Sequence, residues 1–206
     1  METTVSDICV FMNEYASLTY AEKWDNPGLL LGHVEAPVHK IMVALDLMPE
    51  VAEQAIEEEV DLIITHHPYY FHLPSSLAVT DTKMEVMYEL IKHDIAVYAA
   101  HTNLDAARGG VNDVLADRLG LNDVTEIPRK DCPEQGLVRI GVLGEPMELK
   151  DFAAYVRDQL GAAHVTFAGG EEPVFKVAVV GGSGADFMDD AMAAGADTLV
   201  TGDVKY

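Results

Sequence analysis

The sequence has few cysteines and no long apolar run. Its two cysteines, Cys9 and Cys132, are too few for a disulfide framework, and no Cys-x-x-Cys pair offers a zinc site. No apolar run approaches the roughly 18–20 residues that span a bilayer. The polar and acidic N-terminal residues do not have the pattern of a signal peptide. We therefore expect a cytoplasmic protein that has no membrane partner.

Basic residues are also scarce. The 206 residues include 13 lysines and arginines against 35 aspartates and glutamates, so the formal net charge is −22. Such a surface repels the phosphates of nucleic acids, because non-specific binding needs basic side chains to neutralise them. The charge therefore argues against a nucleic acid partner and attracts cations, although it equally suits simple solubility or a salt-tolerant host.

Short apolar runs alternate with helical patterns along the first half of the chain. Runs at 40–46, 61–67 and 95–101 are typical of buried strands, and we expect the first to be covered on both faces. The segment 23–32 before them is rich in turn formers and is expected to be a loop. Helices are expected between the strands and over 109–120, where Gly120 suits a left-handed cap. This alternation is typical of an α/β sheet with parallel crossovers.

The polar stretch 122–136 interrupts this alternation, because it contains two prolines and no periodicity. We therefore predict two α/β domains with mostly parallel sheets, an N-terminal one over 1–127 and a second over 128–206. Further strands are expected at the following positions of the second domain: 137–143, 164–169, 175–182 and 197–203. The last strand has no covering helix after it, so we expect this domain to be incomplete at its C-terminus.

Two adjacent histidines, His66 and His67, follow the apolar run 61–65. In open α/β sheets, ligands bind beyond the carboxyl ends of the strands, which is where this pair is expected. The two imidazoles leave the strand in different directions, so they could contact two metal ions, or a single ion if the loop bends. The alternative is a pair of hydrogen-bonded loop histidines with no ligand.

A second polar group, His101 and Asp105, follows the next predicted strand. Neighbouring parallel strands lie about 4.8 Å apart, so this group and the histidine pair could meet at one edge of the sheet. Imidazole nitrogen and carboxylate oxygen together suit Zn, Fe, Mn or Co, and paired ions can activate a water between them. The spacing therefore favours a metal site, in which His101 could be a ligand, an orienting residue or a general base.

Four stretches of the chain are distinctive together: WDNPGLLLG, VALDLMPEVAEQAIEEEVDLIITHHP, DIAVYAAHTNLDAARGGVNDVLADRLGL and GADTLVTGDVKY. Their most specific pieces are THHP and HTNLD. Together they resemble the NIF-three-like family, whose members are described as dinuclear metal centre proteins and GTP cyclohydrolase I type 2 homologues, and the likeness covers nearly the whole chain in the right order. The resemblance implies two α/β domains with the metal centre in the cleft between them, and often a toroidal homohexamer.

The resemblance also implies roles for the site residues. His66 and His67 match the two strand-end metal ligands, and Asp105 matches the carboxylate that bridges the metals. His101 lies in the same motif and is a candidate catalytic acid–base residue. The expected cofactors are two divalent ions per complete subunit, Zn, Fe or Mn. The family pattern continues past TGDVKY with a histidine and a Gly-His-x-x-x-Glu stretch that supply further ligands, so we expect this sequence to be truncated.

The resemblance favours metal-dependent hydrolysis of a small molecule, with ring opening of GTP as the named candidate. A phosphoesterase is an alternative of the same class. The rival is a non-catalytic metal-binding protein with a regulatory or protein-interaction role. No residue pattern in the sequence selects a purine, so the substrate stays open at this point.

Overall fold

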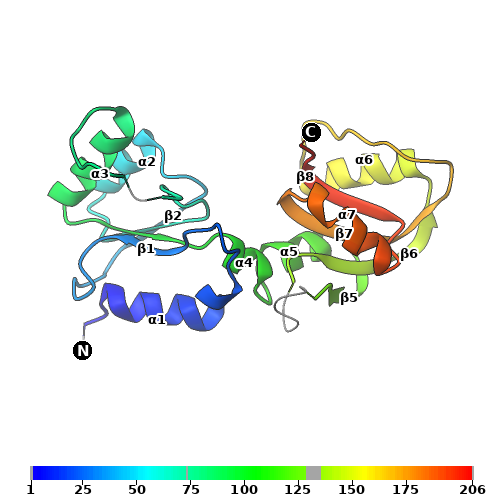
Figure 1. Cartoon of the computed structure of the whole chain (residues 1–206), viewed down its shortest axis with the longest axis horizontal. Coiled ribbons are helices and arrows are strands. Elements are labelled where there is room, and N and C mark those ends of the chain that lie inside the picture. The colour runs from blue at the N-terminus through cyan, green and yellow to red at the C-terminus, as the bar shows by residue number, and fades with distance from the viewer. Residues whose placement is uncertain (1, 73, 129–135, 206) are drawn as a thin grey trace. The chain divides into compact units, whose positions relative to one another are not determined.

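The computed structural model describes residues 2–72, 74–128 and 136–205. It contains two compact units, Met1–Ala107 and Arg108–Tyr206, each built on a four-stranded sheet (Figure 1). The strand order is β1-β4-β3-β2 in the first sheet and β5-β6-β7-β8 in the second. This confirms the predicted α/β class. Among the described residues, no helix has the length and apolar character needed to cross a membrane.

The first unit has three parallel strands and one antiparallel strand, since β2, β3 and β4 run parallel and β1 pairs antiparallel with β4. The strands are β1 (Gly28–Leu31), β2 (Ile41–Ala44), β3 (Leu62–Thr65) and β4 (Ala96–Ala99). The helices are α1 (Val5–Tyr15), η1 (Leu18–Tyr20), α2 (Pro49–Glu57), α3 (Thr82–Lys92) and α4 (Thr102–Ala106).

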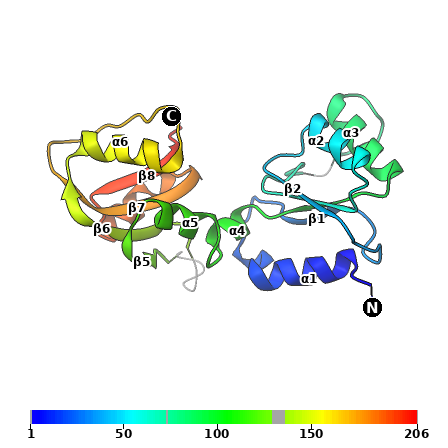
Figure 2. The same cartoon turned by 180° about the vertical axis from the view of Figure 1, so that it is seen from behind.

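Helices cover both faces of the first sheet, with α2 and α3 on one face and α1 on the other (Figures 1 and 2). Successive side chains of a strand point to opposite faces, so adjacent residues enter different cores. Ile63 and Val97 pack with Leu90 of α3, whereas Leu62 and Tyr98 pack in the cluster that includes α1. This sandwich makes β3 and β4 the buried centre of the unit.

Two expectations for the first unit are wrong. The run 40–46 contains β2, but this strand is not covered on both faces, because it lies at the sheet edge with Ile41 40% and Val43 77% exposed. The predicted loop 23–32 contains β1, which forms by pairing with β4. Pairing between distant segments decides both outcomes, and local composition does not contain that information.

The second unit begins with α5, which ends just before Gly120 at φ +62°, as the predicted left-handed cap requires. Helices α5 and α6 pack with β6 and β7 around its core. The elements of this unit are α5 (Val111–Arg118), β5 (Asn122–Glu126), β6 (Arg139–Met147), α6 (Leu149–Leu160), β7 (Val174–Ser183), η2 (Ala185–Phe187), α7 (Met188–Ala193) and β8 (Thr198–Asp203).

The second unit departs from the prediction in three ways. Two of its three strand pairs are antiparallel, so its sheet is not mostly parallel. The segment 164–169 forms no strand. The polar stretch 122–136 contains β5, which pairs with β6, and its residues 129–135 lie outside the described part. The predicted boundary at 127/128 therefore lies further along the chain than the division after Ala107, because α5 and β5 pack on the second sheet.

The same strand–helix–strand arrangement occurs once in each unit. In the first, the Asp61 carboxylate accepts the backbone N–H of Lys40, and the Lys40 ammonium donates to a carbonyl at the end of α2. In the second, Asp197 and Lys176 make the same two contacts, again 21 residues apart. This pair of contacts fixes α2 between the parallel strands β2 and β3, and α7 between the parallel strands β7 and β8.

Candidate metal centre

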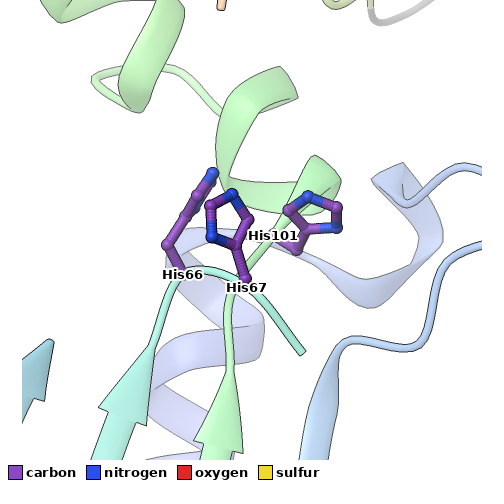
Figure 3. Close-up of side chains that lie close together, drawn as sticks. All are labelled: His66, His67 and His101. Atoms are coloured by element: carbon purple, nitrogen blue, oxygen red, sulfur yellow. The ribbon is translucent and has the colours of Figure 1, made fainter. Parts of the chain in front are cut away.

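Three histidines gather at the carboxyl ends of β3 and β4 (Figure 3). The two strands are parallel, with Thr65 opposite Ala99, so the residues that follow them leave the sheet at the same edge. The ring centroids are 4.9 Å apart for His66 and His67, 5.1 Å for His66 and His101, and 5.4 Å for His67 and His101. One nitrogen of each ring lies within 4.8 Å of the other two, so the cluster could hold a metal ion.

Each imidazole is held from behind at its Nδ1 atom. His66 Nδ1 donates to the backbone oxygen of Ala100 at 2.9 Å, and His67 Nδ1 lies 2.8 Å from the Asp46 carboxylate. His101 Nδ1 lies 2.8 Å from the Asp25 carboxylate. Because these acceptors engage Nδ1–H, the Nε2 lone pair of each neutral ring is left for a ligand. Such outer hydrogen bonds are typical of metal-binding histidines, whose orientation they fix.

Asp25 is the most enclosed of these partners, with a side chain that is 0% exposed. Its carboxylate accepts hydrogen bonds from the His101 ring, from the backbone and hydroxyl of Thr102, and from the Asn26 N–H. Burial alone would raise the pKa of Asp25, but these hydrogen bonds outweigh it and hold the pKa below its ordinary value. The buried group is therefore an anion that fixes the direction of the His101 ring.

Asp105 lies on α4, with its Oδ1 atom 3.6 Å from Nε2 of His66. Its side chain is 15% exposed, and burial raises its pKa to about 6. Burial likewise lowers the pKa of His66, so burial disfavours the charged form of both groups in the metal-free protein. A cation placed between them would favour the carboxylate and the unprotonated imidazole, which are the forms that bind metal.

The structure thus brings together all four residues that the sequence singled out: His66, His67, His101 and Asp105. Three imidazole nitrogens and one carboxylate oxygen fit Zn²⁺, Fe²⁺ or Mn²⁺. Four donors suffice for one such ion, and a second ion would need donors beyond them. That these four residues are ligands or catalytic groups stays a prediction.

Sequence reasoning missed the two carboxylates behind the rings. Asp46 ends the predicted strand 40–46, so the strand-end argument that found the histidines could also have found it. Asp25 gave no such signal, because it lies in a turn-rich segment 76 residues from His101 and only the fold brings the two together.

Comparison with known proteins finds matches along nearly the whole chain. The family model described as Duf34/NIF3 (NGG1p interacting factor 3) matches residues 3–206. A curated relative from Clostridium acetobutylicum, named GTP cyclohydrolase 1 type 2 homolog, is 34% identical over 100% of this chain and 78% of its own length. A relative of the same name from Clostridium perfringens is 38% identical over 98% of this chain and 78% of its own.

Solved structures share the fold. A hypothetical protein of Staphylococcus aureus superposes with a TM-score of 0.92 at 30% identity, covering 100% of this chain and 81% of that one. A NIF3-related protein of Bacillus cereus gives a TM-score of 0.90 at 25% identity, covering 100% and 83%. The likeness therefore extends over both units of the chain.

The support that Asp46 gives to His67 can be tested by the Asp46→Asn substitution. The amide keeps the shape of the side chain but removes the negative charge behind the imidazole. We expect the affinity for Zn²⁺, measured by isothermal titration calorimetry, to fall about tenfold, at the lower end for such partners because Asp46 is half-exposed. Asp81→Asn is the matched control, since it removes a carboxylate that caps α3 and Asn also caps helices. Equal Zn²⁺ affinity in wild type and Asp46→Asn would contradict the role.

The raised pKa of Asp105 predicts a pH-dependent loss of stability in the metal-free protein. The folded pKa is about 6 and the ordinary value 3.8, so the folded chain binds more protons than the unfolded chain between these values. Stability therefore falls as the pH rises through this window, by up to about 3 kcal/mol. Asp105→Asn removes this loss, so the variant should be more stable than wild type at pH 7 and equal to it below about pH 4.

Urea unfolding in the presence of a chelator, repeated from pH 4 to pH 7, measures the effect. In the difference between variant and wild type, the contributions of all other titrating groups to the pH dependence of stability cancel, because the two proteins share these groups. If the difference in the free energy of unfolding does not change with pH, burial does not shift the pKa of the Asp105 carboxyl.

Proposed function

Because this chain belongs to the Duf34/NIF3 family, we propose that it is a metal-dependent hydrolase that acts on a small molecule. In this proposal His66, His67 and Asp105 hold divalent metal, and His101 transfers protons. The observation that carries it is the convergence of three imidazoles whose Nδ1 atoms are all engaged from behind. A pair of loop histidines without a ligand would not need three such anchors.

A bound divalent ion supplies Lewis acidity, which polarises a carbonyl or phosphoryl group and makes water more acidic. The residues of the chain supply the rest. Asp25 keeps the proton of His101 on Nδ1, so Nε2 is free to accept a proton from an attacking water. The buried Asp25 anion then stabilises the imidazolium that forms, and His101 can return the proton to the leaving group.

The assignment of two ions per subunit follows from the family resemblance, as do the homohexamer and the inter-domain position of the site. These remain predictions, and so does the cytoplasmic location expected from the scarcity of cysteine. GTP is the first substrate to assay, because the curated relatives are named GTP cyclohydrolase 1 type 2 homologs. A phosphoesterase would use the same donors on a phosphoryl centre.

A non-catalytic role is the second candidate. The family description itself contains the words interacting factor, which favours a protein that binds a partner. In that case the metal would stabilise the surface around β3 and β4 rather than activate water. A measurement of substrate turnover distinguishes the hydrolase from the non-catalytic protein.

The hydrolase proposal is tested by assaying protein loaded with Mn²⁺, Fe²⁺ or Zn²⁺ against GTP and a generic phosphodiester. We expect a metal-dependent product, and a loss of at least about 100-fold in His66→Ala, because the metal loses a ligand. His93→Ala is the matched control, since His93 is an exposed histidine at the end of α3. No product with any of the metals, together with a His66→Ala change that alters only metal content, would favour the non-catalytic role.

The role of His101 is tested by Asp25→Asn. Without the anion, Nδ1 no longer retains its proton reliably and the imidazolium is not stabilised. We expect kcat to fall by about two orders of magnitude while the Zn²⁺ content stays that of wild type. Circular dichroism must show a folded variant, because Asp25 is buried. If the variant instead loses its metal at unchanged fold, His101 is a ligand and not the acid–base residue.

A further inference from the structure

Two exposed aromatic rings border the imidazole cluster. Trp24 is 57% and Phe71 45% exposed, although both are large apolar side chains. Their ring centroids lie 5.9 Å apart, and those of Trp24 and Phe71 lie 5.9 and 5.8 Å from the His101 ring. These three rings, which we call the aromatic corner, meet at steep angles of 48°, 74° and 62°.

Hydrogen bonds of the neighbouring residues hold the two exposed rings in place. Trp24 directly precedes Asp25, which His101 and Thr102 bind, and Asn26 donates from Nδ2 to the Tyr70 carbonyl at 2.6 Å. That bond ties the loop of Trp24 to the residue before Phe71. The backbone beside both rings is thus held in place while the rings stay exposed, which suits a preorganised binding surface.

The spacing of the rings decides how a ligand could use them. A flat ring inserted between two others needs about 7 Å between their planes, twice the contact distance of about 3.5 Å. The centroids of Trp24 and Phe71 are closer than that, so these two rings already contact each other. A ligand ring must therefore stack on the outward face of Trp24 or Phe71.

We propose that the aromatic corner binds a planar aromatic or heteroaromatic ring of the substrate, stacked on the outward face of Phe71 beside Trp24. The faces of these rings are electron-rich, so an electron-poor or cationic ring would bind best. His101 belongs both to the corner and to the imidazole cluster, and its centroid is 5.1 Å from that of His66. A ring bound here brings its substituents to the cluster. This inference rests on the proposed function, because it names the substrate class of the same site.

Trp24 is the only tryptophan of the chain, so its fluorescence reports on the corner alone. We would titrate metal-free protein with adenosine and with 1-methylnicotinamide, and with ribose as the non-aromatic control. The expected result is saturable quenching by both ring compounds and none by ribose. Linear, unsaturated quenching equal to that of free tryptophan would overturn the proposal.

Variants of Phe71 separate stacking from simple apolar contact, and Trp24 remains as the reporter in each. Phe71→Leu should weaken binding roughly tenfold, whereas Phe71→Tyr keeps the ring and should bind as wild type does. Phe11→Leu is the matched control, since Phe11 is a 61% exposed phenylalanine on α1. Equal affinities of the Phe71→Leu variant and wild type for both ring compounds would also overturn the proposal.

The two proposals fail in different ways. Saturable ring binding without metal-dependent turnover would leave the aromatic corner intact and refute the hydrolase. Turnover of a substrate with an unchanged KM in Phe71→Leu, together with no saturable quenching, would refute the corner and leave the hydrolase intact. Metal content should be the same in wild type and in all the Phe71 variants, since Phe71 is not a ligand.

Discussion

The candidate site depends on the parallel register of β3 and β4. Thr65 lies opposite Ala99, and the ladder continues one step further because the Ala100 N–H donates to the Thr65 carbonyl at 2.8 Å. The Ala100 carbonyl then accepts the Nδ1 proton of His66. A slip of one residue would turn His66 towards the other face of the sheet and break this contact. The apolar cores on both sides of the two strands fix the register, so packing far from the histidines determines their geometry.

The buried carboxylate of Asp25 lies next to this edge of the sheet. An ionised carboxylate without partners is costly in a protein interior, and Asp25 has no exposed surface. Its partners are an imidazole, a hydroxyl and backbone N–H groups, all from the site or the loop beside it. The same contacts that offset the charge therefore lock the loop of Trp24 against α4. The Asp25 carboxylate thus orients His101 and also anchors the loop that carries Trp24.

The sequence predicted which polar residues meet at one edge better than it predicted the edge strands of the sheets. His66, His67, His101 and Asp105 were found because strand ends can be recognised from local apolar runs, and neighbouring parallel strands end at one edge. Strands β1 and β5 were missed because they form only by pairing with segments far along the chain, without a strong apolar pattern of their own. The antiparallel pairing of the second sheet had no local signal for the same reason.

The charged groups and donors around the cluster suit a cation. Asp25, Asp46 and Asp105 surround three imidazoles that are each engaged at Nδ1, so three carboxyl groups and three Nε2 atoms lie at one edge of the sheet. Hydrogen bonds hold the pKa of Asp25 below its ordinary value, whereas burial raises the pKa of Asp105 to about 6. A proton is one way to neutralise this carboxyl, and a divalent cation is another that also uses the imidazole lone pairs. The overall charge of −22 attracts cations everywhere on the surface, whereas this edge also offers three nitrogen donors with fixed direction that could select a transition metal.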